Sequence, residues 1–234
     1  MNRIKLINEL IKRKHAKNYL EIGVDIGNCF LKIKAPVKIG VDPRDRIPFL
    51  RKLKYYIKNT YNYKNKFYQL TSDDFFSKHQ DFLKKEGLDV VLIDGLHTHE
   101  QTIKDVENTL KYLNDDGVIV LHDCNPLSEA AAFPTEDATQ AYTQPGYSGI
   151  WNGDVWKTIA LLRSNRDDLN IMVLNCDNGL GIIKKEKPEN RLQLNGKQIK
   201  DLNYHDLQAN RKKYLNLKEE DLFSQVIENL VKGN

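Results

Sequence analysis

The stretch YLEIGVDIGNCFLKI, residues 19–33, decides how this chain is read. An apolar run ends in Glu21, two glycines follow at Gly23 and Gly27, and an amphipathic segment comes next. Glycine lets the backbone approach a ligand closely because it has no Cβ, and a helix after such a turn offers free N–H groups at its start. The stretch therefore predicts a buried strand, a sharp turn that can receive a ligand, and a helix over residues 26–33.

Further apolar runs alternate with helical patterns along the chain, which predicts an α/β fold with a parallel sheet and helices on both faces. The spacing of Ile103, Val106 and Leu110 predicts a helix over residues 98–117. The segment LNIMVLNCDNGLGIIKK predicts two strands joined by a turn at Asn178-Gly179. That hairpin places an antiparallel strand at the edge of the sheet.

Composition narrows the class of protein. The chain has 234 residues, 40% of them hydrophobic and 29% charged, with a net charge of +4, which is typical of one or two globular domains. The basic residues are not gathered into one arm, so we expect no nucleic acid partner. The three cysteines show no CxxC spacing, which indicates a reducing compartment without a zinc site. The charged N-terminus and the lack of a long apolar run favour a cytoplasmic protein with no membrane partner.

The pattern divides the chain at about residue 184. Residues 1–184 form the predicted main domain, with a helix over residues 1–17 as an N-terminal extension. Residues 124–150 break the periodicity with small residues, Pro and Gly, which predicts a lid over a substrate. Residues 185–234 are predicted to be a helical extension that ends in an amphipathic helix. Packing of that helix on the domain is favoured, and a homodimer contact is the alternative.

Polar residues follow successive strands of the predicted sheet, where ligands bind in open α/β folds. Asp42 ends the second strand, about 20 residues after the glycines, where a carboxylate accepts the hydroxyls of a ribose. Ser72 and Asp73 end the third, and Asp94 ends the fourth. Glu21 would lie against a diphosphate, so a cationic or polar ligand is favoured over a dinucleotide.

Taken in order, EIGVDIG, GVDP, LTSDD, VVLIDGLHTHE and GVIVLHDCNP resemble the class I S-adenosylmethionine-dependent methyltransferases over residues 19–184. The closest likeness is to a small bacterial group that includes the macrolide-sugar O-methyltransferases. The resemblance implies a Rossmann-like three-layer sandwich, with a mostly parallel seven-stranded sheet and an antiparallel C-terminal hairpin. It also implies S-adenosylmethionine as cofactor, bound by Glu21, Gly23, Gly27, Asp42, Ser72, Asp73 and Asp94.

Methyl transfer to a hydroxyl requires a general base or a metal, because an alcohol holds its proton at neutral pH. The candidate catalytic residues are Asp94, His97 and His122, at two neighbouring strand ends. Asp94 and Asp123 are the candidate metal ligands, because the related enzymes bind magnesium with carboxylates at these positions. Those enzymes often have two adjacent acids at the second position, whereas this chain has only Asp123 after His122, so the use of Mg²⁺ stays open.

The function that the sequence favours is methylation of a hydroxyl, with a sugar hydroxyl as the acceptor that the resemblance suggests. A protein that binds S-adenosylmethionine without catalysis is the first alternative. A nicotinamide-dependent oxidoreductase is the second, and Glu21 argues against it. A glycosyltransferase is disfavoured because no DxD motif ends a strand.

Overall fold

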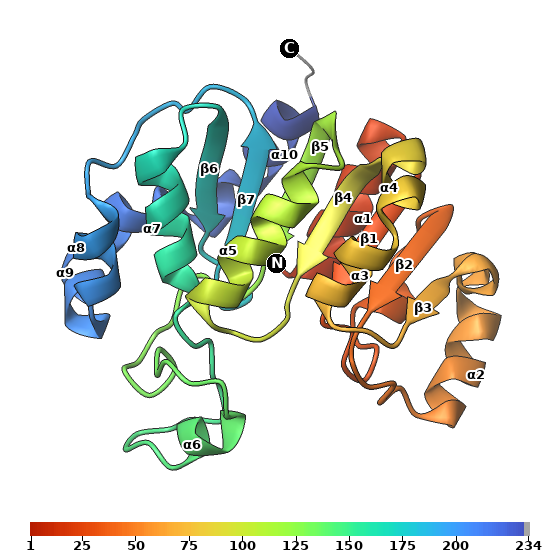
Figure 1. Ribbon diagram of the computed structural model, residues 1–234, viewed down its shortest axis with the longest axis horizontal. Coiled ribbons are helices and arrows are strands. Elements are labelled where there is room, and N and C mark those ends of the chain that lie inside the picture. The colour runs from red at the N-terminus through yellow and green to blue at the C-terminus, as the bar shows by residue number, and fades with distance from the viewer. Residues whose placement is uncertain (232–234) are drawn as a thin grey trace. The chain divides into compact units, whose positions relative to one another are not determined.

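The computed structural model describes residues 1–231 as an α/β protein (Figure 1). The strands are β1 (Asn18–Ile22), β2 (Val37–Val41), β3 (Lys66–Tyr68), β4 (Leu88–Ile93), β5 (Leu113–Leu121), β6 (Leu169–Leu174), β7 (Leu180–Lys185) and β8 (Leu217–Lys218). The α-helices are α1 (Arg3–Lys14), α2 (Phe49–Lys58), α3 (Ser72–Lys78), α4 (Gln80–Glu86), α5 (His99–Leu110), α6 (Ala138–Tyr142), α7 (Val155–Asn165), α8 (Gly196–Asp201), α9 (Tyr204–Leu215) and α10 (Phe223–Val231). Short 3₁₀ helices are η1 (Phe30–Lys32), η2 (Thr60–Lys64) and η3 (Glu220–Leu222).

The strands follow the order β3-β2-β1-β4-β5-β7-β6-β8 in one sheet. β1 pairs in parallel with β2 and β4, whereas β6 and β7 pair antiparallel. The predicted Rossmann-like α/β fold and its hairpin are thus confirmed. The sheet has eight strands instead of seven, because the two-residue β8 pairs in parallel with β6 and takes the edge position from the hairpin.

The described chain divides into two compact units. The first comprises Met1–Gly95, Asp105–Val120 and the segment from Val226 onward, and the second comprises Leu96–Lys104 and Leu121–Gln225. α5 and β5 therefore contribute residues to both units. The division at residue 184 that the sequence predicts stays a prediction.

The core of the first unit forms where apolar side chains of α1 meet the sheet. Leu6, Ile7, Leu10 and Ile11 recur at helical spacing and are all buried, and α1 contacts β4. β1 is buried at every position, as a central parallel strand must be. Burying each of these aliphatic side chains contributes about 1.5–3 kcal/mol.

The core of the second unit is built around α7, which contacts β6, α8 and α9. Eight residues of α7 are buried, including Trp156 and Arg163. The Arg163 guanidinium donates to the carbonyl oxygens of Lys213 and Tyr214, at 2.5 and 2.8 Å. These bonds tie α9, part of the predicted C-terminal extension, to α7.

Two predicted helices differ from the structure. The helix predicted over residues 26–33 is only the short 3₁₀ helix η1, because the turn before it uses the residues that a longer helix would need. The helix predicted over residues 98–117 ends at Leu110 as α5. Leu113 is already buried in β5, and the Leu88 N–H donates to the Tyr112 carbonyl at 2.9 Å, so pairing of strands replaces the last helical turns.

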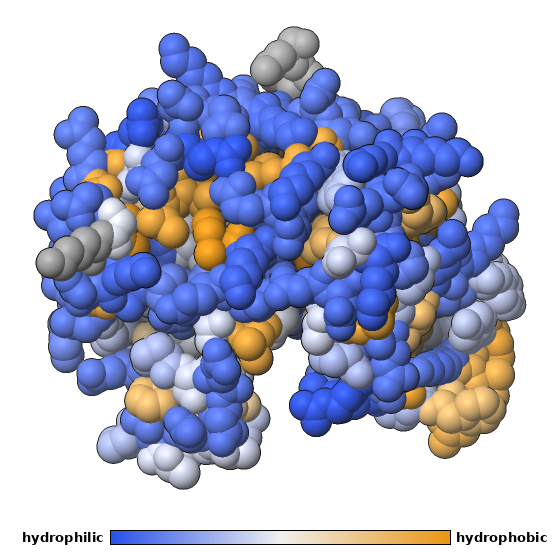
Figure 2. Space-filling view, in the orientation of Figure 1, coloured by the Kyte–Doolittle hydropathy of each residue, from blue (hydrophilic) through white to orange (hydrophobic). Residues whose placement is uncertain are grey.

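The apolar side chains of α2 face the solvent. None of its ten residues is buried, and Figure 2 shows hydrophobic residues gathered over this helix at the lower right. Among the described residues, no helix is long and apolar enough to cross a bilayer.

Candidate functional site

The turn after β1 in the first unit is held so closely that only glycine fits at residue 23. Gly23 has φ +85°, and a Cβ placed there would lie 1.9 Å from the Asp94 carbonyl oxygen. The Gly23 N–H donates to the Val41 carbonyl at 2.9 Å, and the Asp94 N–H donates to the Ile22 carbonyl at 2.8 Å. The ends of β1, β2 and β4 therefore meet at this glycine, as the sequence predicts.

The rest of the turn also uses left-handed backbone. Gly27 has φ +74°, and Asp25 has φ +50°, a conformation that favours glycine. The Asp25 carboxylate pairs with Arg46 at 2.8 Å. The turn is thus a defined loop whose shape depends on Gly23 and Gly27.

Glu21 supports this turn from inside the protein. Its carboxylate accepts hydrogen bonds from the Tyr19 hydroxyl and, at 3.1 Å, from the Phe30 N–H. Burial raises the pKa of Glu21 to about 7, the Tyr19 hydrogen bond lowers it, and the nearby Asp94 charge raises it. Both oxygens of Glu21 have partners within the chain, so its side chain shapes the turn, and its contact with the cofactor stays a prediction.

Asp42 lies at the end of β2 and orders the same turn. One carboxylate oxygen accepts from the Asp25 N–H at 2.9 Å, and the other accepts from the Arg44 N–H at 2.9 Å. A carboxylate offers about four lone-pair sites, so each oxygen can accept one further hydrogen bond. Asp42 therefore has acceptor sites left for a ligand, and its role as the ribose-binding residue stays a prediction.

The other predicted binding residues of the first unit lie at element ends. Ser72 and Asp73 open α3 after Thr71, whose hydroxyl accepts from the Asp74 N–H at 3.1 Å. Asp94 follows β4 and lies 3.7 Å from the Arg3 guanidinium. Ser72 and Asp94 are partly exposed and Asp73 is exposed, so a ligand can reach them.

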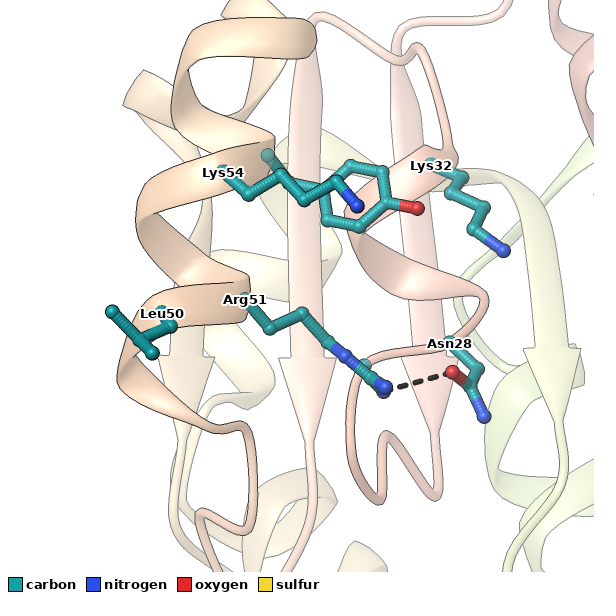
Figure 3. A pocket seen from close by; sticks show the side chains of 7 residues that line it. Asn28, Lys32, Leu50, Arg51 and Lys54 are labelled. Atoms are coloured by element: carbon teal, nitrogen blue, oxygen red, sulfur yellow. Dashed lines mark hydrogen bonds between the residues drawn. The ribbon is translucent and has the colours of Figure 1, made fainter.

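A pocket of about 360 Å³ opens beside the glycine turn (Figure 3). Its lining residues are Gly27, Asn28, Lys32, Leu50, Arg51, Lys54 and Tyr55. No local pattern in the sequence marks its three cations, because Lys32 lies in η1 whereas Arg51 and Lys54 lie in α2.

Asp123 is the centre of a hydrogen-bonded cluster in the second unit. Its Oδ2 lies 2.8 Å from His122 Nδ1 and 3.3 Å from His97 Nε2. Its Oδ1 accepts from the Asn152 amide at 2.5 Å. Asp123 is buried and has φ +60°, in the left-handed region that aspartate adopts more readily than most residues.

The loop before α7 fixes His97. His97 Nδ1 lies 3.1 Å from the Trp151 carbonyl oxygen, and the two rings lie 4.9 Å apart. A Cβ at Gly153 would lie 1.8 Å from the His97 carbonyl oxygen. Asn152 and Gly153 are functional neighbours that the sequence analysis did not identify, although they lie beside Trp151 in one WNGD run.

His99 faces Asp154 instead of Asp123. The Asp154 carboxylate accepts from the His99 N–H at 2.8 Å and lies 2.7 Å from His99 Nδ1. Burial raises the pKa of Asp154, but the hydrogen bonds and charge of His99 lower it further, so the net pKa is below its usual value. His99 therefore belongs to a structural pair at the starts of α5 and α7.

His97 and Asp123 both carry atoms that can bind a metal ion. The two oxygens of Asp123 also lie near three nitrogen atoms, those of His97, His122 and the Asn152 amide. Asp94, the other predicted ligand, belongs to the first unit. The predicted magnesium pair therefore stays a prediction.

Comparisons with known proteins agree with this geometry. Residues 20–124 match the family Methyltransf_24, described as a methyltransferase domain. No curated protein matches the chain. The predicted resemblance to class I methyltransferases is confirmed, and the likeness to macrolide-sugar enzymes is not tested by this match.

Solved structures share the fold at low identity. An O-methyltransferase from Bacillus cereus in complex with SAH is 13% identical, with a TM-score of 0.57 over 78% of this chain and 80% of that chain. The O-methyltransferase TomG from Streptomyces achromogenes, involved in tomaymycin synthesis and solved with SAM, is 14% identical, with a TM-score of 0.54 over 79% of each chain. The SAH-bound methyltransferase PaMTH1 from Podospora anserina is 16% identical, with a TM-score of 0.55 over 79% of this chain and 78% of that chain.

Proposed function

Because residues 20–124 match a methyltransferase-domain family, we propose that the protein transfers a methyl group from S-adenosylmethionine to a hydroxyl oxygen of a small molecule. A sugar hydroxyl is the acceptor we favour, on the resemblance of the strand ends. The observation that carries the proposal is the turn at Gly23, where three strand ends meet beside the free lone pairs of Asp42.

The first unit holds the cofactor in this proposal. Bound S-adenosylmethionine supplies an electrophilic methyl group on a sulfonium sulfur. The backbone at Gly23 and Gly27 receives its methionine part, and Asp42 accepts the ribose hydroxyls. Ser72 and Asp73 contact the adenine, and Asp94 contacts the cofactor.

A histidine beside Asp123 supplies the base in this proposal. The acceptor hydroxyl must lose its proton as the new bond forms, and a histidine accepts a proton near neutral pH. His122 is the first candidate because Asp123 holds only its Nδ1, whereas both ring nitrogens of His97 lie within hydrogen-bonding distance of oxygen atoms, the Trp151 carbonyl and the Asp123 carboxylate. His97 is the second candidate, and its side chain is the more exposed of the two, at 20% against 7%. Asp123 orients both rings and stabilises the imidazolium that forms. Asp94 is retained as a third candidate catalytic residue.

Magnesium has no step in this mechanism. Asp94 and Asp123 are the residues to test for Mg²⁺ binding. We expect turnover to continue after a chelator has removed divalent ions. Loss of turnover that added Mg²⁺ restores would place a metal in the reaction.

Calorimetry with S-adenosylmethionine and S-adenosylhomocysteine tests the cofactor, with NADH as the control ligand. We expect both sulfur compounds to bind and NADH not to bind. Asp42→Ala removes a charged acceptor and should weaken binding by roughly tenfold or more. Asp81→Ala, an exposed acid in the first turn of α4, is the matched control and should bind like the unaltered chain.

A screen of hydroxylated acceptors with methyl-labelled cofactor tests the reaction. Asp123→Asn should bind the cofactor normally and lose roughly 100-fold in turnover, the scale of a general base. Failure of S-adenosylmethionine to bind refutes the function. Normal turnover in Asp123→Asn removes the histidine cluster from the mechanism, and binding without turnover on any acceptor favours the non-catalytic alternative.

A further inference from the structure

The outward face of α2 is an exposed apolar surface. Phe49 and Leu50 are each 75% exposed, Ile57 is 74% exposed and Leu53 is 51% exposed. Their spacing places them on one face of the helix, which we call the α2 apolar face. Of the eleven large hydrophobic side chains exposed in the described part of the chain, six lie between residues 49 and 63.

Cations border this face and line the pocket behind it. Lys54 and Lys58 alternate along the helix with Leu53 and Ile57. Within residues 1–231, neither lysine has a carboxylate partner, and the same is true of Lys32.

The pocket behind α2 is lined by cations and contains no carboxylate. Arg51 donates to the Ile26 carbonyl and to the Asn28 side chain, both at 2.8 Å, so it faces the protein. Figure 3 shows Arg51 and Lys54 reaching toward the side where Lys32 lies, whereas Leu50 points the other way. Lys32, Arg51 and Lys54 all line the pocket, which has no acidic residue.

This arrangement is that of a helix that lies on a membrane surface. Such helices combine an apolar face with lysines and arginines, and they bind anionic lipids through buried apolar area and charge attraction. We propose that α2 docks this protein on an anionic phospholipid bilayer, with the α2 apolar face at the acyl boundary. Lys54 and Lys58, which border this face, then lie near the lipid phosphates.

A second copy of this chain is a poorer occupant. A two-fold contact would bring Lys54 and Lys58 near the same lysines of the other copy. A ten-residue helix is about 15 Å long, which is small for the roughly 800 Å² per partner that stable interfaces bury. The proposal is independent of the reaction, and it departs from the sequence-based expectation of no membrane partner, which rests on spanning segments only.

Vesicle co-sedimentation of the full chain tests the proposal. We expect binding to vesicles of phosphatidylcholine mixed with phosphatidylglycerol, and little binding to phosphatidylcholine alone. The double variant Lys54→Gln/Lys58→Gln should weaken binding by roughly 25-fold, since each lysine near an anionic surface contributes roughly fivefold. Leu50→Ser/Ile57→Ser should abolish binding and keep the thermal unfolding of the unaltered chain, because both side chains are exposed.

Lys84→Gln/Lys85→Gln provides the matched control, since these exposed lysines end α4 and lie outside the patch. It should bind like the unaltered chain. The proposal is overturned if the chain fails to bind anionic vesicles, if neutral vesicles bind equally well, or if the control weakens binding as much as Lys54→Gln/Lys58→Gln. A dimer in light scattering that Leu50→Ser/Ile57→Ser dissociates would assign the face to a second copy instead.

Discussion

Two glycines of this chain share a backbone conformation but not their surroundings. Gly23 and Gly149 have φ +85° and +87°. A Cβ at Gly23 would collide with the Asp94 carbonyl, whereas nothing lies within 4 Å of a Cβ at Gly149. Substituting each glycine by alanine therefore measures two effects on stability. At Gly149 only the left-handed backbone is unfavourable, whereas at Gly23 the new Cβ also collides with the Asp94 carbonyl.

We expect Gly149→Ala to lower the free energy of unfolding by about 1–2 kcal/mol, the cost of left-handed backbone for alanine. Gly23→Ala should cost several kcal/mol more and disrupt cofactor binding, because the backbone of Asp94 must move. Urea unfolding of both variants measures the difference. Equal losses of unfolding free energy in the two variants would contradict the collision between a Cβ at residue 23 and the Asp94 carbonyl.

Glu21 makes stability depend on pH. Its pKa is about 7 in the folded chain and 4.5 ordinarily, so the folded state holds the extra proton between these values. Its contribution to stability is therefore complete below pH 4.5 and declines as pH rises through 7. Each pKa unit is worth 1.36 kcal/mol, so the total is about 3 kcal/mol.

Urea unfolding at several pH values should show this decline in the unaltered chain but not in Glu21→Gln. The difference between the two chains isolates Glu21 from other titrating groups. A difference that stays constant from pH 4.5 to 8 would contradict the burial that raises this pKa.

At the scale of elements, α7 begins at a side-chain pair rather than at a conventional cap. Asp154 occupies the N-cap position, but its side chain makes no capping bond. It bonds instead to His99 at the start of α5, 55 residues earlier in the chain. Two helix starts are thereby joined through one carboxylate.

Asp154→Asn should lower the free energy of unfolding by about 2 kcal/mol at pH 7, as expected for a buried charged hydrogen bond. The folded-state pKa is depressed, so the contribution is present above the unfolded pKa and is lost as pH falls through the folded one. Asp168→Asn, at an exposed pair with Arg166, is the control and should cost less than about 1 kcal/mol. Equal costs in urea unfolding would refute a special role for Asp154.

Elements were predictable where their causes are local. The apolar runs of β1 and β4 and the Asn178-Gly179 turn are visible in sequence because burial and turn conformation act over a few residues. η1 and the end of α5 depend on tertiary contacts of Phe30 and Tyr112, so periodicity overestimated both helices. The outward orientation of the apolar residues of α2 likewise has no local signal in the sequence.

The candidate site follows the same rule. Gly23 and Asp42 can be recognised as candidate site residues in the sequence, because each directly follows an apolar run that forms a strand. Asn152 lies 29 residues from Asp123, and no local pattern reports their contact.

At the scale of the whole molecule, the first unit is completed by the end of the chain. Ile227 and Leu230 of α10 are buried, and the Lys14 ammonium donates to the Leu230 carbonyl at 3.3 Å. The predicted packing of this amphipathic helix on the domain is therefore present. Asp116 pairs with the same ammonium at 3.4 Å.

Ile227→Ala and Leu230→Ala should each lower the free energy of unfolding by about 2–5 kcal/mol, as for other buried aliphatic side chains. Glu228→Ala, on the exposed side of α10, is the control and should change it by less than about 0.5 kcal/mol. Urea unfolding measures all three. Small effects at Ile227 and Leu230 would mean that α10 is dispensable for the core.

The position of α10 has a consequence for the protein while it is being made. A ribosome releases residues in order, and nascent domains usually fold from the N-terminus as they emerge. Here α1 and the first strands leave the exit tunnel early, yet Lys14 cannot meet Leu230 until more than two hundred later residues have been translated. During that interval the surface that α10 will cover is open to chaperones and to other nascent chains.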